Sequence, residues 1–127
     1  MIDTSAIVAI IKRETGFEAI RAAIGAADRA LMSTGNLLEL HLVTTSYRTI
    51  TDLPKLLFVL RVVSEPVTAA HLEAATAAHD RYGRGSGHPA KLNYGDCFAY
   101  GLAKASRLPL LFKGNDFAQT DIEAVPY

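Results

Sequence analysis

The sequence has one cysteine, no surplus of either charge, and no apolar run long enough to cross a membrane. The single cysteine, Cys97, excludes a disulfide framework and a zinc site built from cysteines. The 13 basic residues balance the 13 acidic ones, so composition does not show the basic surplus typical of dedicated nucleic-acid binders. The first residues lack the basic and apolar regions of a signal peptide. These absences predict a soluble, cytoplasmic protein.

The length of 127 residues corresponds to one domain of ordinary size. Hydrophobic residues make up 50% of the chain, enough for a real core and too many for a disordered segment. Residues 82–89, with three glycines and a proline, are typical of a loop and too short for a linker between domains. We therefore expect a single domain over residues 1–127. A net charge near zero also favours self-association.

Helical and strand-like patterns alternate along the chain. Apolar spacing and capping signals predict helices at residues 4–13, from residue 15, at 36–48, from 52, at 68–82 and at 95–107. Short apolar runs predict strands at residues 1–3, 30–32, 62–67, 108–112 and 122–125. This alternation indicates an α/β domain with a mainly parallel sheet. In such sheets the functional crevice lies beyond the carboxyl ends of the strands, so residues that follow strands are the first candidates.

Four carboxylates occupy positions for which a structural explanation is weak. Asp3 ends the first predicted strand, and Asp116 follows the strand at residues 108–112. Asp96 opens a predicted helix, and Glu39 lies among leucines in residues 37–43. Each has a structural alternative: Asp3 and Asp96 as helix caps, Asp116 as a turn residue, and Glu39 on a solvated helix stripe.

Convergence of these acids would have a chemical consequence. Two carboxylates ~4 Å apart repel by roughly 4 kcal/mol near a protein surface, so such a site needs a cation or raised pKa values. Oxygen-only ligands suit Mg²⁺ or Mn²⁺, which can activate water against a phosphodiester. The residues alone leave open whether the acids are structural or belong to a metal-dependent phosphotransfer enzyme.

Three segments resemble the PIN-domain toxins of the VapC type. They are Asp-Thr-Ser-Ala at residues 3–6, Leu-Asn-Tyr-Gly-Asp-Cys-Phe-Ala-Tyr at 92–100 and Leu-Leu-Phe-Lys-Gly-Asn-Asp-Phe at 110–117. The middle segment is the most specific, and the likeness spans essentially the whole chain. The resemblance implies a three-layer α/β/α domain around a short, mainly parallel sheet. It also implies an Mg²⁺- or Mn²⁺-dependent ribonuclease toxin, a homodimer inhibited by a VapB antitoxin, with tRNA or another structured RNA as its substrate.

The resemblance also assigns roles to individual residues. The metal-binding, catalytic acids would be Asp3, Glu39, Asp96 and Asp116, with Asp3 and Asp96 as direct ligands. Ser5 and Asn115 would be polar neighbours of the site. Only Met1 and Ile2 precede Asp3, so the first strand is expected to be short. Four basic residues could contact the RNA phosphates or could instead be ordinary solvated charges: Arg13, Arg84, Lys91 and Lys113.

Two other classes of protein are alternatives. A phosphatase with an aspartyl nucleophile needs a second Asp two residues after the first, where this chain has Ser5. A phospho-accepting receiver domain needs two adjacent acids after the first strand and an Asp after a central strand. No Asp follows residues 62–67 directly, and Lys113 alone favours this class. Residues 53–60 could form a dimer or antitoxin groove, or simply pack in the core.

Overall fold

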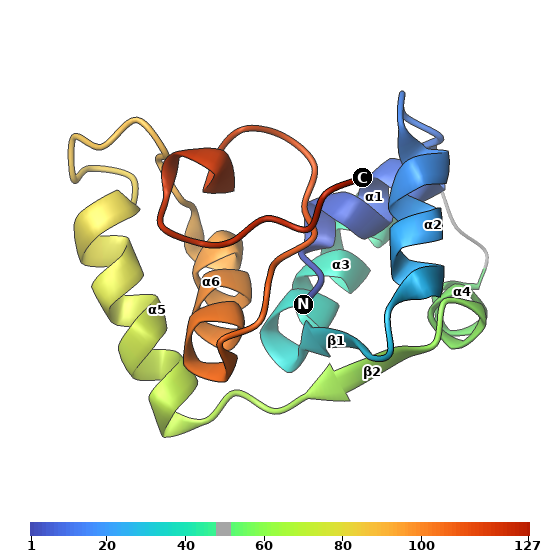
Figure 1. The fold of residues 1–127 in the computed structure, drawn as a ribbon, viewed down its shortest axis with the longest axis horizontal. Helices are drawn as coiled ribbons and strands as arrows, with labels where there is room; N and C mark the ends of the chain where they lie inside the picture. Colours follow the sequence, from blue (N-terminus) through green and yellow to red (C-terminus); the bar gives the residue numbers. More distant parts are fainter. Residues whose placement is uncertain (48–51) are drawn as a thin grey trace.

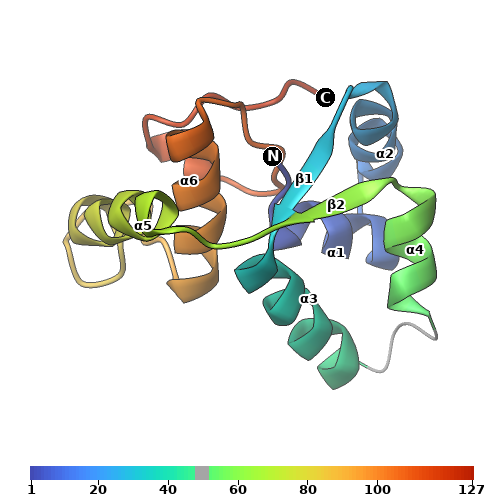
Figure 2. The ribbon, with the colours of Figure 1, turned by 90° about the horizontal axis from the view of Figure 1, so that it is seen from below.

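The computed structural model describes residues 1–47 and 52–127, which form three layers. Helices α5 and α6 cover one side of a central layer of parallel strand segments, and α1 to α4 lie on the other (Figure 1; Figure 2). The elements are α1 (Thr4–Lys12), α2 (Phe17–Ala26), β1 (Ala30–Ser33), α3 (Thr34–Tyr47), α4 (Leu53–Val59), β2 (Val62–Glu65), α5 (Ala69–Tyr82), α6 (Tyr94–Ser106) and the 3₁₀ helix η1 (Phe117–Gln119). The predicted three-layer α/β/α class is confirmed.

The central layer is parallel throughout the described residues. β1 pairs with β2 in a register that sets Ala30 opposite Val62. On its other side, Leu31 O accepts from Ile2 N at 2.8 Å, and Leu111 O accepts from Asp3 N at 2.9 Å. A further bridge joins residues 110 and 124. The spatial order is therefore β2, β1, residues 1–3, residues 110–112 and residues 123–125.

The predicted strands differ from these segments mainly in length. The strand expected at residues 62–67 ends at Glu65, because Pro66 has no amide hydrogen to continue the ladder. Isolated bridges are the only strand pairing at three of the predicted strands, residues 1–3, 108–112 and 122–125. These segments therefore extend the central layer without forming long strands. The first strand is short, as expected.

Side chains of the strand segments alternate between two hydrophobic cores. Met1, Leu31 and Leu110 point into the core shared with α5 and α6. Ile2, Met32 and Leu111 point into the core beneath α1 to α4. Successive side chains of an extended chain face opposite sides, so this alternation is what makes the fold three-layered.

Most predicted helices lie within two residues of their predicted bounds. Asp52 caps α4 by accepting from Lys55 N at 3.0 Å, and Thr68 caps α5 by accepting from His71 N at 3.3 Å. α2 begins at Phe17, two residues after the predicted start. α3 already begins at Thr34, and the predicted end of that helix, at residue 48, lies outside the described residues. Across residues 1–47 and 52–127, no helix combines the length and apolar character needed to span a membrane.

The C-terminal segment is fastened to α6 by one carboxylate. Asp121 accepts hydrogen bonds from the Tyr100 hydroxyl at 2.6 Å and from Lys104 Nζ at 2.8 Å. The hydrogen bonds from Lys104 and Tyr100 lower the pKa of Asp121 to about 2. Its ionised form therefore stabilises the folded chain.

We predict that Asp121→Asn lowers the free energy of unfolding by about 1 kcal/mol at pH 7, the usual size for partly exposed charged hydrogen bonds. The folded pKa is depressed, so this contribution is present above about pH 4 and is lost as pH falls towards 2. Urea unfolding across this pH range measures it. Asp80→Asn, at an exposed position of α5, is the control. An equal effect of both substitutions would contradict the prediction.

Candidate active site

The first turns of α1 and α6 and the N-terminal half of α3 meet beyond the carboxyl ends of residues 1–3 and β1 (Figure 2). Asp3 immediately precedes α1, Glu39 lies in α3, and Asp96 lies in the first turn of α6. Asp116 follows the segment at residues 110–112. This is the edge of the sheet at which the sequence predicts the functional crevice.

Asp3 is buried, with only 3% of its surface exposed. Its Oδ2 accepts hydrogen bonds from Ser5 N at 2.9 Å and from Ser5 Oγ at 2.5 Å, so Asp3 does cap α1. Ser5 Oγ in turn accepts from Lys113 N at 2.9 Å, which fixes the hydroxyl between the two. Asp3 Oδ1 is buried and has no hydrogen-bond partner among the described residues. Burial raises the pKa of Asp3, and the charge of Glu39 adds to the rise.

Asp96 sits in the third position of α6, where the helix cap is Asn93. Asn93 Oδ1 accepts from Asp96 N at 3.0 Å, and Asp96 Oδ2 accepts from Asn93 N at 2.6 Å. The suggestion that Asp96 is itself the N-cap is therefore wrong, because the reciprocal pair places the cap three residues earlier.

The charges of the other three predicted acids act on Asp96. Burial raises the pKa of Asp96 to about 7, and the charges of Asp3, Asp116 and Glu39 add to that rise. Coulombic repulsion of this kind requires that the carboxylates are near one another. The four acids, which come from distant parts of the chain, are thus close enough to affect the ionisation of Asp96.

Glu39 is anchored by two residues that sequence reasoning missed. Its Oε2 accepts from the Thr4 hydroxyl at 2.5 Å and from Asn36 Nδ2 at 3.2 Å. Asn36 Nδ2 also donates to Gly95 O at 3.0 Å, which connects α3 with α6. A solvated helix stripe is therefore the wrong interpretation of Glu39. The available signals were the position of Asn36 one turn before Glu39 and of Thr4 next to Asp3.

Gly95 permits the close approach of Glu39 to α6. A Cβ atom at residue 95 would overlap the Glu39 carboxylate. Because Thr4 and Asn36 hold that carboxylate, it has little freedom to move aside. The glycine beside Asp96 is thus a requirement of the site's packing.

The remaining predicted residues lie at the exposed rim. Asp116 and Asn115 are both solvent-exposed, and their side chains make no hydrogen bond within residues 1–47 and 52–127. Asp116 contributes its charge to the site, as the pKa of Asp96 indicates. Asn115 has no such link to the acids.

The donor set suits a hard divalent cation, because it consists of carboxylate oxygens and includes the unpaired Asp3 Oδ1. In the described part of the chain, no three His, Cys, Asp or Glu side chains are already arranged to hold a metal ion. Asp3, Glu39 and Asp96 each accept a protein hydrogen bond through one carboxylate oxygen. Their other oxygens are those available to a cation.

The three-layer domain with a parallel central layer and acids at one sheet edge can be compared with known protein families. The family model of the PIN domain matches residues 1–123, and the chain therefore belongs to the PIN-domain family. Within that family it is similar to "Ribonuclease VapC30" of Mycobacterium tuberculosis, with 45% identity over 128 residues covering 98% of this chain and 97% of that protein.

Two further relatives have the same extent. "VapC ribonuclease Mb0625" of Mycobacterium bovis is 43% identical over 126 residues, which cover 97% of this chain and 95% of the relative. "Ribonuclease VapC42" of Mycobacterium tuberculosis is 40% identical over 129 residues, which cover 96% and 95%. The predicted resemblance to VapC-type PIN proteins is confirmed.

The packing at Gly95 leads to a stability prediction. Gly→Ala in a helix normally stabilises by up to about 1 kcal/mol. Gly25→Ala in α2, where the added methyl meets open space, should show that gain in urea unfolding. Gly95→Ala should instead destabilise, because the methyl group displaces Glu39 from Thr4 and Asn36.

Glu39→Ala provides the test of this cause. In that background the overlap is gone, so Gly95→Ala should no longer be destabilising. A penalty for Gly95→Ala that persists without the Glu39 side chain would contradict the explanation.

A second prediction concerns pH in metal-free buffer. The pKa of Asp96 rises from 3.8 to about 7 on folding, so the folded state binds this proton more tightly than the unfolded state. The contribution of Asp96 to stability is therefore most favourable below about pH 4 and declines as pH rises to about 7. Asp96→Asn retains an oxygen that can accept from Asn93 N but has no charge to bury.

Urea unfolding in EDTA at pH 4.5 and 7.5 measures this difference. Between pH 4.5 and 7.5 we expect the free energy of unfolding of Asp96→Asn to rise relative to that of the wild type by on the order of 3 kcal/mol. Parallel pH profiles for the two proteins would show that the Asp96 carboxylate is not under electrostatic strain.

Proposed function

We propose that this protein is the toxin of a toxin–antitoxin pair and acts as an endoribonuclease, with residues 1–127 forming one PIN domain. The relatives named as VapC ribonucleases support the activity. The observation that carries the proposal is the buried, unpaired oxygen Asp3 Oδ1, which lies among carboxylates close enough to raise the pKa of Asp96. The reaction is hydrolysis of an RNA phosphodiester bond, with Mg²⁺ or Mn²⁺ as cofactor.

In this proposal Asp3 and Asp96 are the direct metal ligands, and Glu39 and Asp116 complete the acidic pocket. When bound, the cation lowers the pKa of a water molecule and neutralises charge on the phosphate. Ser5 orients Asp3 through its hydroxyl, and Thr4 orients Glu39. Asp116 is exposed, so it lies on the side from which substrate arrives. Asn115 is its polar neighbour.

The cytoplasm is the proposed compartment, and the proposed partners are a VapB-type antitoxin and a second copy of this chain. The surface of α4 supports a docking role for residues 53–60. Leu53, Leu56 and Leu57 pack partly against the core, whereas Phe58 is 83% exposed and Val59 is 66% exposed. Residues 53–60 thus combine a packing side with an apolar outer side. The proposed substrate is tRNA or another structured RNA.

The identity and hydrogen bond of Ser5 count against the phosphatase and receiver-domain alternatives. The phosphatase needs a carboxylate there, and the receiver needs adjacent acids after the first strand. Instead the Ser5 hydroxyl donates to Asp3 and fixes its orientation. We therefore prefer the nuclease.

We predict that Asp96→Asn and Asp3→Asn each abolish RNA cleavage in the presence of Mg²⁺. The loss should exceed the roughly 10- to 100-fold effect typical of removing a group behind a metal ligand. EDTA should stop the wild-type reaction, and added Mn²⁺ should restore it. Gel analysis of total tRNA measures the cleavage activity, and circular dichroism shows whether each variant is folded.

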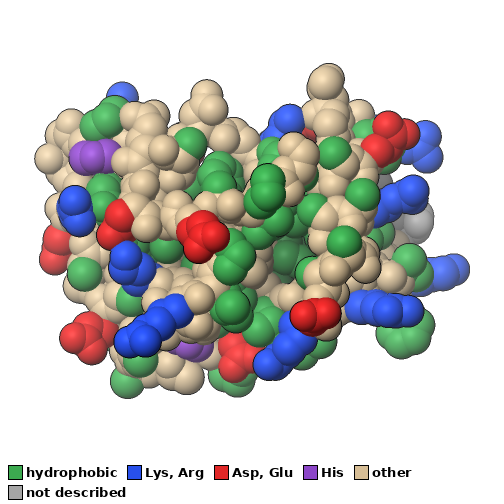
Figure 3. Space-filling view, viewed as in Figure 1, with side chains coloured by type: hydrophobic (Ala, Val, Ile, Leu, Met, Phe, Trp, Pro, Cys, Tyr) green, Lys and Arg blue, Asp and Glu red, His purple; other side chains and the backbone are tan. Residues whose placement is uncertain are grey.

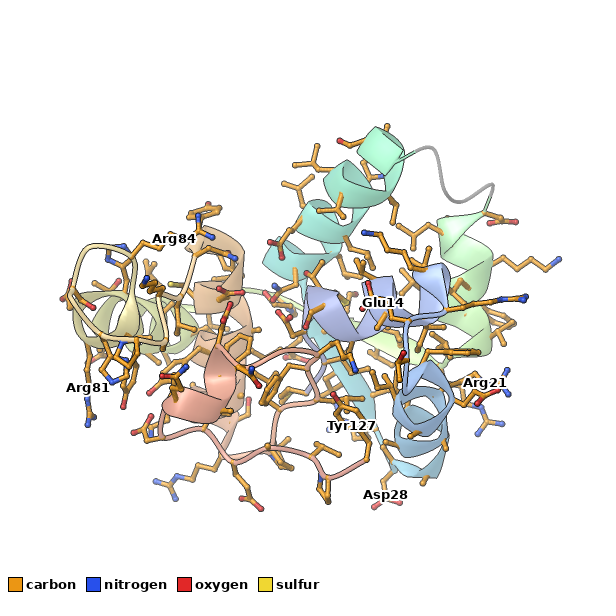
Figure 4. All side chains as sticks on the ribbon, turned by 90° about the horizontal axis from the view of Figure 1, so that it is seen from above. Glu14, Arg21, Asp28, Arg81, Arg84 and Tyr127 are labelled. Carbon is orange, nitrogen blue, oxygen red and sulfur yellow. The ribbon has the colours of Figure 1, made fainter. Side chains whose placement is uncertain are left out.

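Asp28→Asn, at an exposed position just after the C-terminal end of α2 (Figure 4), is the matched control and should cleave at the wild-type rate. Wild-type cleavage by a folded Asp96→Asn protein would refute the proposed site. Cleavage that persists undiminished in EDTA would refute the metal requirement.

A further inference from the structure

An exposed aromatic side chain stands two residues before Asp96. Tyr94 is the first residue of α6, and 80% of its surface is exposed. Its ring meets the ring of Phe98 edge to face, with centroids 5.0 Å apart and an interplanar angle of 87°. An aromatic ring this exposed gains little from the protein's own packing, so it is free to stack on a ligand.

Phe98 fixes the direction of this aromatic pair. Its ring lies directly on Gly35, where a Cβ atom would be only 2.6 Å from Phe98 Cγ. Because Gly35 belongs to the first turn of α3, the Phe98 side chain of α6 packs against α3. Tyr94 therefore rests on a rigid base.

Beside Tyr94, a recess of about 290 Å³ opens between α5 and α6. Its lining combines apolar walls with a few polar groups: Leu72, Thr76 and His79 from α5, and Tyr94, Cys97 and Phe98 from α6. A nucleobase has the matching character, since its faces are apolar and its edge carries hydrogen-bonding groups. His79 and Thr76 offer partners for such an edge.

Positive charge adjoins the same end of α6. Two backbone hydrogen bonds join the ends of the loop that precedes α6: Arg84 N donates to Leu92 O at 3.0 Å, and Leu92 N donates to Tyr82 O at 2.9 Å. Arg84 projects beside the start of α6 in Figure 4, and Lys91 is exposed three residues before Tyr94.

On the face drawn in Figure 3, acidic and basic side chains are interspersed, in keeping with the net charge of zero. Attraction of RNA therefore depends on local groups such as those in this loop. Aromatic platforms next to basic side chains are the usual means of holding single-stranded nucleic acid.

We propose that the recess between α5 and α6 holds one unpaired base of the RNA substrate, stacked on Tyr94. The inference rests on the proposed ribonuclease function and adds to it a requirement for a single-stranded position beside the cleaved bond. Charge complementarity favours a base over other occupants, because the exposed Arg84 and Lys91 lie at the same end of α6 and suit the phosphates that flank the base. Arg84 and Lys91 then contact the phosphates of that strand.

The test measures binding of a fluorescein-labelled single-stranded RNA of mixed sequence, about 12 nucleotides long, a length within the range single-strand binders cover. All variants carry Asp96→Asn so that binding is observed without cleavage. Tyr94→Ala should weaken binding about 5- to 100-fold, the usual effect of removing one stacking side chain. Tyr94→Phe keeps the ring and should bind within about twofold of the parent. Leu108→Ala, which removes an exposed apolar side chain beyond the C-terminal end of α6, should also leave binding unchanged.

A second readout reports stacking directly. The same RNA is prepared with 2-aminopurine, whose fluorescence is quenched when it stacks on an aromatic ring. Quenching should occur with the parent and with Tyr94→Phe and should be absent with Tyr94→Ala. Unchanged affinity or persistent quenching in Tyr94→Ala would overturn the proposal.

Sedimentation velocity separates a second copy of the chain from RNA as the occupant. If Tyr94→Ala dissociates a dimer and leaves the quenching of 2-aminopurine intact, the recess is a subunit contact and the proposal is overturned. Cleavage of RNA by the wild type is measured in parallel. Active wild type with unaltered stacking in Tyr94→Ala refutes only the recess, whereas a wild type that neither binds nor cleaves RNA refutes the proposed function as well.

Discussion

The burial of carboxylates beside one another is the constraint on which the rest of the structure depends. Asp3, Glu39 and Asp96 are brought together in surroundings that raise the pKa values of Asp3 and Asp96. Each carboxylate accepts a hydrogen bond that limits its movement: Asp3 from Ser5, Glu39 from Thr4 and Asp96 from the backbone of Asn93. These bonds orient the acids without neutralising them. The hydrogen bonds from Ser5 and Asn93 favour the ionised acids, whereas burial and the neighbouring charges oppose ionisation, and a divalent ion would relieve that opposition.

The site lies where the two helical layers meet. α1 and α3 belong to the layer that covers Ile2 and Met32, whereas α6 belongs to the layer that covers Met1 and Leu31. Asn36 joins them, because its amide donates both to Glu39 and to the backbone of Gly95. The relative placement of the two layers therefore sets the geometry of the acids. A change in core packing far from Asp96 can alter the site through this junction.

Sequence reasoning placed Asp3 and Asp116 at one edge of the sheet because both follow predicted parallel strands, and the parallel bridge between Ile2 and Leu111 agrees with that placement. It placed the cap of α6 wrongly, since Asn93 and Asp96 are both good capping residues and only the backbone geometry distinguishes them. Thr4 and Asn36 were missed because their roles arise from the approach of α3 to α6, which depends on contacts between distant residues. The short pairing of residues 108–112 was likewise hidden, because an apolar run does not reveal how many ladder bonds it will form.

β2 forms the outer margin of the sheet, and Val63 on it is 52% exposed. An open strand of this kind invites a neighbouring molecule to add its own strand. Here the invitation is limited, since β2 ends after four residues and Pro66 then lacks the amide hydrogen that an added strand would need. Pairing of a second molecule along this margin is therefore limited to the four residues of β2.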